Sequence, residues 1–546
     1  MRPRPFVFAL AVAAGCARSA SIVAPAHEPG THPHPTQATH APLPAAPAPL
    51  RRLSNEEYDN SVRDLLGDTT RPAADFPPDE LAGGFESGSV SPVTQSLVER
   101  YLAAAEALSA AAAPRLPTLG GCVPAQREAE CAAQLVERLG RAVFRRPVEP
   151  RERDALTSLY ARAAPRRGHE RALALVVQAM LQSPAFLYRA EPQRSPEEAA
   201  RALTGYELAT RLSYFLWAST PDERLLDDAG AGRLACAEGV EAAARRLLAD
   251  RRAIDGVRNF YRQWLDLREL GTVSRDARVH PEFTPELRRS MVEETLRFAA
   301  DATLEGRDLV RALYTSQESF VDAALARHYG VEAPTRAGFS RVSLPAARRA
   351  GVLTHASVLT VHASAEDASP VMRGKFVREK VLCQEVPPPP PNVAIALPRV
   401  DPSVTKKERF ATHRVAPACG SCHRLMDPVG FGFEHYDATG AWRDREGGRD
   451  VDATGVLEGA GGPAAGFDGA VALGELLAES PRARRCVTTQ WLRAALGRRE
   501  RDEDEASLEA AHAAFVTSGF DARALLIAIV KTDSFRRVGF DRGAPQ

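Results

Sequence analysis

The sequence has no excess of either charge and, beyond its first residues, no long apolar run. Lys+Arg and Asp+Glu both number 70 in 546 residues, so no net field draws nucleic acid or an anionic membrane surface to the chain. No later stretch approaches the roughly 18 consecutive apolar residues of a membrane helix. No phosphate-binding loop, dinucleotide fingerprint or Ser-His-Asp pattern is discernible, and no long period repeats. We therefore expect neither nucleic-acid binding nor a repeat architecture.

The N-terminus has the layout of an export signal. Arg2 and Arg4 precede nine apolar residues, Phe6 to Ala14, which are too few to span a bilayer. The run AAGC predicts a lipoprotein box within residues 1–16, with Cys16 as the acylated residue; plain secretion is the alternative, because Ala stands where Leu is usual. Residues 17–50 are rich in Pro, Ala and His without apolar periodicity, which predicts a tether.

Helical periodicity dominates the rest of the chain and predicts a mainly α protein of several modules, with a small cytochrome c-like module near the C-terminus. Ser54 and Glu57 have capping-box spacing, and Gly67 ends that first helix. Residues 204–226 are apolar on nearly all sides, which predicts one central, buried helix. Five prolines at 387–391 predict an extended polyproline segment. The expected modules cover residues 51–115, 130–190, 200–330, 345–445 and 466–540.

Export would carry the cysteines into an oxidising compartment, where unpaired thiols are a liability. Cys122 and Cys131 are close enough in sequence to close one loop, and Cys383 with Cys486 is a plausible long-range pair. These pairings are hypotheses, because spacing alone does not fix connectivity.

The run CGSCH, with Cys419, Cys422 and His423, is the most specific chemical signal in the chain. Two thiols three residues apart reach the two vinyl groups on one edge of a haem, and the next histidine lies beneath the iron. The motif predicts one covalent haem c. Structural zinc shared with His413 or His435, a disulfide, and a redox dithiol are the alternatives, although no βαβ unit surrounds the motif.

The second axial ligand is less clearly indicated. Met372 is a weak candidate, as Met ligates iron in electron-transfer cytochromes, and His413 is another. His355, His362 and an open position are further possibilities. Met426 is only three residues past His423, on the same side of the ring, and is a poor candidate.

Several stretches resemble one set of bacterial secreted modules, the domain of unknown function 1592 with its companions 1587, 1595, 1588 and 1585, of planctomycete and myxobacterial type. They are LSNEEYDNSVRDLLG, FRRPVEP, QAMLQSPAFLYR, ELATRLSYFLWASTPDERLL, SPVMRGKFVREKVLCQEVPPPPPNV, HRVAPACGSCHRLMDPVGFGFEHYDATGAWR and CVTTQWLRAALGR. The resemblance implies export and a c-type haem on Cys419, Cys422 and His423. The residues that match the signature around the motif are Asp427, Pro428, Gly430, Glu434, Asp437, Gly440 and Arg443.

These signature residues also have physical interpretations. Asp427-Pro428 predicts a turn after the haem helix. Glu434, Asp437 and Arg443 would bond haem propionates or pair with one another. Glu293 and Glu294, farther upstream, are candidate catalytic carboxylates of the helical body, but adjacent helical residues point about 100° apart, so at most one of them faces a cavity. An exposed helix surface is the default expectation for both.

Two functions compete at this stage: electron transfer between periplasmic redox partners, and haem-dependent oxidoreduction in a cavity of the large helical body. One CxxCH motif allows one covalent haem, enough for a one-electron relay. A structural or binding lipoprotein, in which CGSCH holds zinc or a disulfide, is a third class. The expected location is the periplasmic face of a membrane, reached only through a lipid anchor, or the secreted fraction. The sequence indicates no oligomeric state.

Overall fold

The computed structural model describes residues 50–86, 93–123, 127–193, 199–387, 404–415 and 419–540, with side chains up to residue 411 in the segment that ends at 415. The signal, Cys16, the tether and prolines 388–391 lie outside these ranges. The described chain is mainly helical, with short strands in antiparallel pairs, as the sequence predicted. Within it, no helix is both long and apolar enough to cross a membrane.

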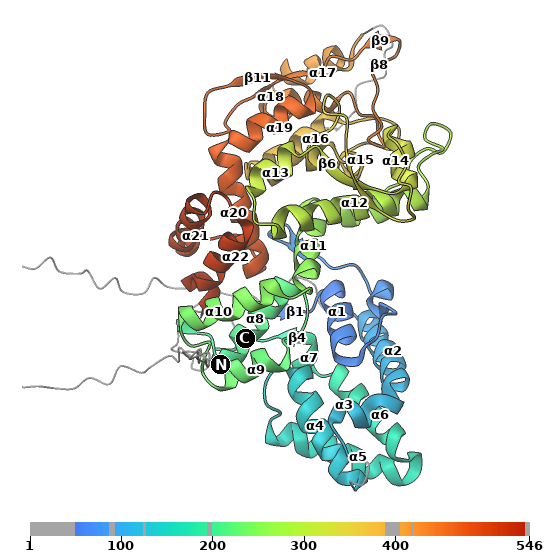
Figure 1. Ribbon diagram of the computed structural model, residues 1–546, viewed down its shortest axis with the longest axis vertical. Coiled ribbons are helices and arrows are strands. Elements are labelled where there is room, and N and C mark those ends of the chain that lie inside the picture. Colours follow the sequence, from blue (N-terminus) through green and yellow to red (C-terminus); the bar gives the residue numbers. More distant parts are fainter. Residues whose placement is uncertain are drawn as a thin grey trace, which may run out of the picture.

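The N-terminal body packs its helices around one apolar core and forms the lower end of the elongated molecule (Figure 1). Helix α1 begins with the predicted capping box, in which the Ser54 hydroxyl accepts from the Glu57 N–H, and it ends at Gly67 in the left-handed conformation. The elements are β1 (Arg51–Arg52), α1 (Asn55–Leu66), β2 (Leu81–Ala82), β3 (Phe85–Glu86), α2 (Gln95–Ala112), α3 (Leu116–Gly120), α4 (Glu128–Phe144), α5 (Pro150–Arg167), α6 (His169–Leu181), α7 (Pro184–Leu187) and β4 (Tyr188–Arg189).

The central part contains the helix expected over 204–226, but the chain divides it into two. Helix α8 stops where Ala218 adopts a left-handed conformation, and the Asp222 side chain then caps α9. The elements are β5 (Ala200–Ala202), α8 (Gly205–Trp217), α9 (Glu223–Gly230), α10 (Ala237–Ala249), α11 (Ala253–Trp264), α12 (Pro285–Leu304), α13 (Leu309–Thr315), β6 (Glu318–Val321), α14 (Ala323–Tyr329) and β7 (Ser340–Ser343).

The remaining chain forms the upper end of the molecule and then returns to its middle (Figure 1). Its elements are α15 (Ala356–Val361), α16 (Pro370–Phe376), a π-helical turn (Val377–Val381), α17 (Lys406–Val415), α18 (Gly420–Gly430), β8 (Arg445–Glu446), β9 (Arg449–Asp450), β10 (Thr454–Leu457), β11 (Ala465–Asp468), α19 (Gly469–Glu479), α20 (Pro481–Leu496), α21 (Glu505–Thr517), α22 (Ala522–Lys531), α23 (Asp533–Arg536) and β12 (Arg537–Gly539).

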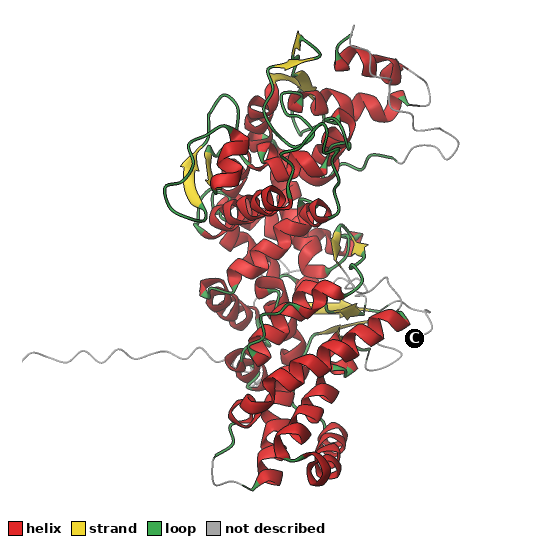
Figure 2. Ribbon diagram, turned by 90° about the vertical axis from the view of Figure 1, so that its right-hand side faces the viewer, coloured by secondary structure: helices red, strands yellow, loops and turns green. Residues whose placement is uncertain are grey.

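The C-terminal helices share one hydrophobic core with the central helices. Phe260 of α11 stacks on Trp491 of α20 with ring centroids 3.5 Å apart. Strand β12 pairs with β5, so the end of the chain completes a strand pair that its middle begins. The helical stack that results runs the length of the molecule in both views (Figures 1 and 2).

Both cysteine pairs that the sequence suggested are disulfides. Cys122 and Cys131 close one short loop, with Cα atoms 5.1 Å apart. Cys383 and Cys486 join the segment after the π-helical turn to α20, with Cα atoms 5.4 Å apart. The second bond therefore ties the upper end of the molecule to the C-terminal helices.

Candidate functional site

The CGSCH motif opens helix α18, and a neighbouring helix fixes the position of α18. Cys419 is the cap residue, and its carbonyl accepts from the His423 N–H at 3.1 Å. Helix α16 crosses α18 in backbone contact: a Cβ on Gly374 would lie 2.0 Å from the Met426 oxygen, and one on Gly430 would lie 1.8 Å from the Pro370 oxygen. Neither glycine can carry a side chain there, so the two helices have one close-packed arrangement.

His423 is oriented by a buried carboxylate one turn further along α18. Its Nδ1 lies 3.0 and 3.1 Å from the two carboxylate oxygens of Asp427, whose side chain is fully buried. A carboxylate only accepts, so Nδ1 carries the proton and Nε2 is the nitrogen suited to bind a metal. Metal-binding histidines in proteins commonly donate their other ring N–H in this way.

The two thiols of the motif are reduced and partly exposed. The Cys422 sulfur lies 3.6 Å from the carbonyl oxygen of Pro387, the first of the five prolines. Two thiols and an imidazole with a fixed tautomer are the donor set that covalent haem attachment requires. The residues present therefore fit a haem c.

Three axial candidates have described side chains, and these lie in different surroundings. Met372 is 44% exposed, and α16 meets α18 through Gly374. His355 is buried beside Thr295 and Ser319, and burial lowers its pKa to about 3. His362 stacks on Phe376, and burial lowers its pKa to about 4. The side chain of His413 lies outside the described residues. The second axial ligand therefore stays a prediction.

The signature residues after the motif form local hydrogen bonds and ion pairs. Asp427-Pro428 does not form a turn, because α18 continues through Pro428 to Gly430. Glu434 and Arg443 pair with one another at 3.3 Å, and the buried Lys406 ammonium lies 3.1 Å from Glu434. One carboxylate oxygen of Asp437 accepts from the backbone N–H groups of Thr439 and Ala441 and closes a turn.

His435 does not join the thiols as a zinc ligand would. Its ring stacks on Trp442 with centroids 4.4 Å apart. Its Nδ1 donates to the Arg443 carbonyl oxygen at 2.9 Å. Both contacts hold the ring in the loop after α18.

An open cavity of about 580 Å³ lies along another face of α18. Arg378, Lys407 and Arg424 give it basic walls, and Glu458 is the acidic residue of its lining. Arg378 Nε donates to the Leu425 carbonyl at 2.8 Å, and Lys407 pairs with Asp452 at 3.0 Å. The cavity therefore has a net basic wall next to α18, and Arg378 and Lys407 in that wall are held by the contacts above.

Glu294, expected on an exposed surface, is fully buried, and that expectation is wrong. It accepts hydrogen bonds from the hydroxyl groups of Tyr329 at 2.6 Å and Ser319 at 2.7 Å. Burial raises its pKa to about 7, against the effect of these two hydrogen bonds. Glu293 remains partly exposed and pairs with Arg258 and Arg297.

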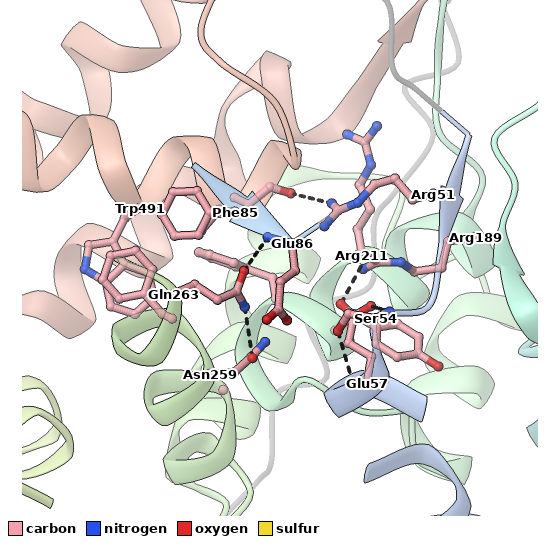
Figure 3. Close-up of a pocket in the computed structure, with 16 residues that line it drawn as sticks. Arg51, Ser54, Glu57, Phe85, Glu86, Arg189, Arg211, Asn259, Gln263 and Trp491 are labelled. Carbon is pink, nitrogen blue, oxygen red and sulfur yellow. Dashed lines mark hydrogen bonds and ion pairs between the residues drawn. The ribbon is translucent and has the colours of Figure 1, made fainter. Parts of the chain in front are cut away.

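A second, small cavity lies where the N-terminal, central and C-terminal helices meet (Figure 3). It measures about 40 Å³, which admits a few water molecules and no larger ligand. Its walls are polar: Arg189 forms an ion pair with Glu57, and the Glu86 N–H donates a hydrogen bond to the Gln263 side chain. It is a polar junction between modules rather than a binding site.

The chain matches five protein families, each described as a protein of unknown function. DUF1587 matches residues 51–114, DUF1595 residues 131–191, DUF1592 residues 203–331, DUF1588 residues 349–446 and DUF1585 residues 465–535. The DUF1588 family, which contains the CGSCH motif, is labelled PSCyt3, a name that points to a cytochrome-like module. No curated protein and no solved structure matches the chain. The chain thus belongs to the proteins assembled from DUF1587, DUF1595, DUF1592, DUF1588 and DUF1585 modules in that order.

Proposed function

We propose that the chain is an exported c-type haem protein that transfers electrons between periplasmic partners. Cys419 and Cys422 hold one haem through thioether bonds, and His423 binds its iron. A haem bound there supplies a one-electron couple between ferric and ferrous iron. The observation that carries the proposal is the pairing of two reduced thiols with a histidine whose tautomer a buried carboxylate fixes.

Asp427 prepares His423 for this role. The carboxylate holds the imidazole plane, and it increases the electron density on Nε2, which favours binding to ferric iron. Because Asp427 is fully buried, water does not weaken this interaction. The position of Asp427 is in turn fixed by the close contact between α16 and α18.

Electron transfer is favoured over catalysis by the placing of the thiols. Cys419 and Cys422 are partly exposed, so the haem edge that they hold lies near the surface, where a redox partner can approach. The basic cavity beside α18 gives that surface a positive side that suits an acidic partner.

Export is the second part of the proposal. The two disulfides fit an oxidising compartment. The basic, apolar and small-residue order of the N-terminus fits a signal, with Cys16 as the lipid-anchored residue. The protein then acts at the periplasmic face of a membrane.

The test is expression with the cytochrome c maturation machinery, followed by acid extraction and a pyridine haemochrome spectrum. We expect one acid-stable haem per chain in the wild type and none in Cys419→Ala/Cys422→Ala. Cys122→Ser/Cys131→Ser is the matched control, because it also removes two cysteines and should keep the haem. A colourless wild-type protein loaded with zinc would refute the proposal.

The spectrum of the ferric protein separates transfer from catalysis. Six-coordinate, low-spin iron supports electron transfer. Five-coordinate, high-spin iron would instead assign the chain to haem-dependent oxidoreduction.

A further inference from the structure

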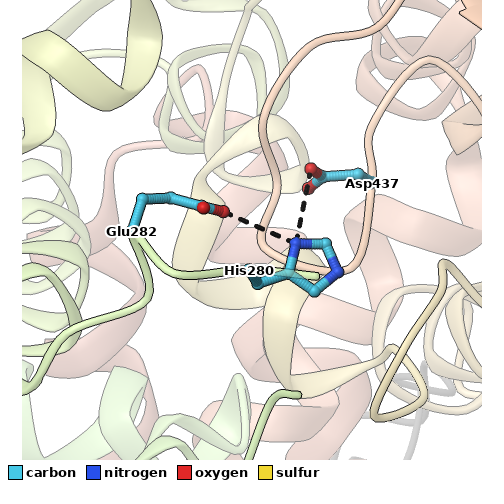
Figure 4. A group of neighbouring side chains, drawn as sticks. All are labelled: His280, Glu282 and Asp437. Atoms are coloured by element: carbon cyan, nitrogen blue, oxygen red, sulfur yellow. Dashed lines mark ion pairs between the residues drawn. The ribbon is translucent and has the colours of Figure 1, made fainter. Parts of the chain in front are cut away.

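A group of three potential metal ligands lies apart from the CGSCH motif, where two family modules meet. His280 and Glu282 belong to the loop before α12, and Asp437 belongs to the turn after α18 (Figure 4). Their ligand atoms all lie within 4.8 Å of one another. His280 Nδ1 is 3.5 Å from Glu282 Oε1 and 4.0 Å from Asp437 Oδ2.

The tautomer of His280 is fixed by its other nitrogen. Nε2 lies 3.1 Å from the carbonyl oxygen of Glu366, which only accepts, so Nε2 carries a proton. In the neutral imidazole, Nδ1 is then a bare lone pair that faces two carboxylates. A cation among these three electron-rich groups would be bound favourably, and Thr439 Oγ1, 3.5 Å from Glu282 Oε1, is the hydroxyl donor next to them.

His280 is built into the protein rather than mobile on its surface. Its side chain is only 7% exposed, and no hydrogen bond to Nδ1 forms among the described residues. A buried imidazole nitrogen that accepts no hydrogen bond and faces two carboxylates is the arrangement of a metal ligand. The hydrogen bond from Nε2 to a backbone carbonyl is the usual outer-shell contact of such a ligand.

Asp437 is also held in place with one oxygen to spare. Oδ1 accepts from the backbone N–H groups of Thr439 and Ala441 at 2.7 and 3.0 Å, and the Asp437 carbonyl oxygen accepts from buried Arg373 at 2.6 Å. Oδ2 is the oxygen directed at His280. Glu282 is 45% exposed and provides the open side through which an ion enters.

The spacing suits a small divalent ion. Ligands about 2.0–2.1 Å from a tetrahedral Zn²⁺ lie about 3.4 Å from one another. The distances from His280 Nδ1 to Glu282 Oε1 and to Asp437 Oδ2, 3.5 and 4.0 Å, are close to this value. The exposed Glu282 side chain can move to adjust its own distances to the other two ligands. One imidazole with two carboxylates favours Zn²⁺ or a similar transition-metal ion over Ca²⁺ or Mg²⁺, which take oxygen ligands.

We propose that His280, Glu282 and Asp437 bind one divalent transition-metal ion, with a fourth position open to water. The ion would join the DUF1592 module to the turn that follows the CGSCH helix. This proposal is independent of haem attachment, because neither thiol contributes a ligand.

The test measures Zn²⁺ bound per chain after desalting, and its affinity by calorimetry, in the Cys419→Ala/Cys422→Ala background, so that the thiols do not contribute. Glu282→Gln/Asp437→Asn should bind one zinc ion fewer, and each single variant should bind that ion at least tenfold more weakly. Glu286→Gln is the matched control, since it removes one exposed carboxylate four residues from Glu282. It should bind zinc like its parent.

X-ray absorption at the zinc edge gives a second readout. We expect only nitrogen and oxygen ligands, with an imidazole contribution that His280→Gln removes. Equal zinc content and affinity in the parent and the double variant would overturn the proposal. Absence of bound zinc in the parent would also overturn it.

Discussion

The N-terminal body and the region of residues 349–446 are stabilised in different ways. In the N-terminal body, helices α2, α4 and α6 bury apolar faces, and Leu135, Val136 and Leu173 have no exposed surface. In residues 349–446 the helices are short, and buried arginines bind the loops between them. Arg373 donates to the carbonyls of Leu359, Phe433, Tyr436 and Asp437.

Arg349, another buried arginine of this region, also binds backbone carbonyls. It donates to the carbonyls of Thr354 and Gly440 and lies over the Tyr329 ring at 3.7 Å. A guanidinium has five donors in a rigid fork, so one side chain can satisfy backbone groups that no strand or helix pairs. The N-terminal body uses the same device where α7 meets β4, since buried Arg145 donates to the carbonyls of Ala185, Phe186 and Tyr188. The comparison teaches that irregular backbone is fixed by multivalent donors in both regions, whereas the long helices of the N-terminal body pack mainly through apolar faces.

The largest effect that tests this comparison is expected from Arg373→Met. The substitution leaves several buried carbonyls without donors, and we expect it to lower the free energy of unfolding of this region by about 4 kcal/mol. Arg373→Lys keeps the charge with fewer donors, so its free energy of unfolding should lie between those of the wild type and Arg373→Met. Hydrogen exchange measures the change locally, with Leu135→Ala in the N-terminal body, at about 3 kcal/mol, as reference. Faster exchange in residues 131–143 after Arg373→Met would break the comparison.

The next effect concerns the buried carboxylate beside this region. Glu294 has its pKa raised by burial to about 7 in the folded chain, so its contribution to stability is full below pH 4.5 and is lost as the pH rises through 7. We expect a loss of about 3 kcal/mol over that range in the wild type. Glu294→Gln should remove this pH dependence in urea unfolding. Glu293→Gln, its exposed neighbour, should retain it.

The disulfides Cys122–Cys131 and Cys383–Cys486 extend the comparison of the two regions, because they close loops of different length. Cys383 and Cys486 are 103 residues apart, and Cys122 and Cys131 are nine apart. Loop entropy gives about 4.7 kcal/mol for the long loop and about 2.7 kcal/mol for the short one. Replacing the Cys383–Cys486 pair by serine should therefore lower the free energy of unfolding by about 2 kcal/mol more than replacing the Cys122–Cys131 pair, as measured in denaturant titrations. Equal effects would mean that strain or residual structure outweighs loop entropy.

The smallest effect is expected at the haem ligand. Asp427→Asn keeps an acceptor for His423 Nδ1 but removes the charge, so ferric iron loses stabilisation. We expect the midpoint potential of the haem-loaded protein to rise by about 60 mV, a tenfold change for one electron. Asp452→Asn, an exposed change just before β10, controls for net charge. A potential that moves equally in both variants would remove the specific role of Asp427.

Local features of the fold were predictable from the sequence. The capping box at Ser54 and Glu57 depends on residues three apart, and both disulfides fitted loop closure between known cysteines. The break after α8 was missed although Pro221 and the capping Asp222 mark it, because the apolar pattern on both sides of them was read as one helix. Burial of Glu294 was missed because its hydroxyl partners, Ser319 and Tyr329, come from later elements.

The candidate sites show the same limit. Asp427 stands four residues from His423, so a helix was sufficient to bring them together, but the expected turn at Pro428 hid the pair. His280 and Asp437 are far apart in sequence, and no periodicity relates them. Their meeting depends on how α12 and α18 are placed, which only the complete fold determines.

The pairing of Ala200–Ala202 with Arg537–Gly539 has a consequence for the order in which the chain folds. The first of these strands leaves the ribosome long before the second exists. Until then the central helices lack both that partner and the Arg211 contact with the Phe535 carbonyl. The middle of the molecule is therefore the last part to close, and removing Arg537–Gly539 should expose it to proteases before either end.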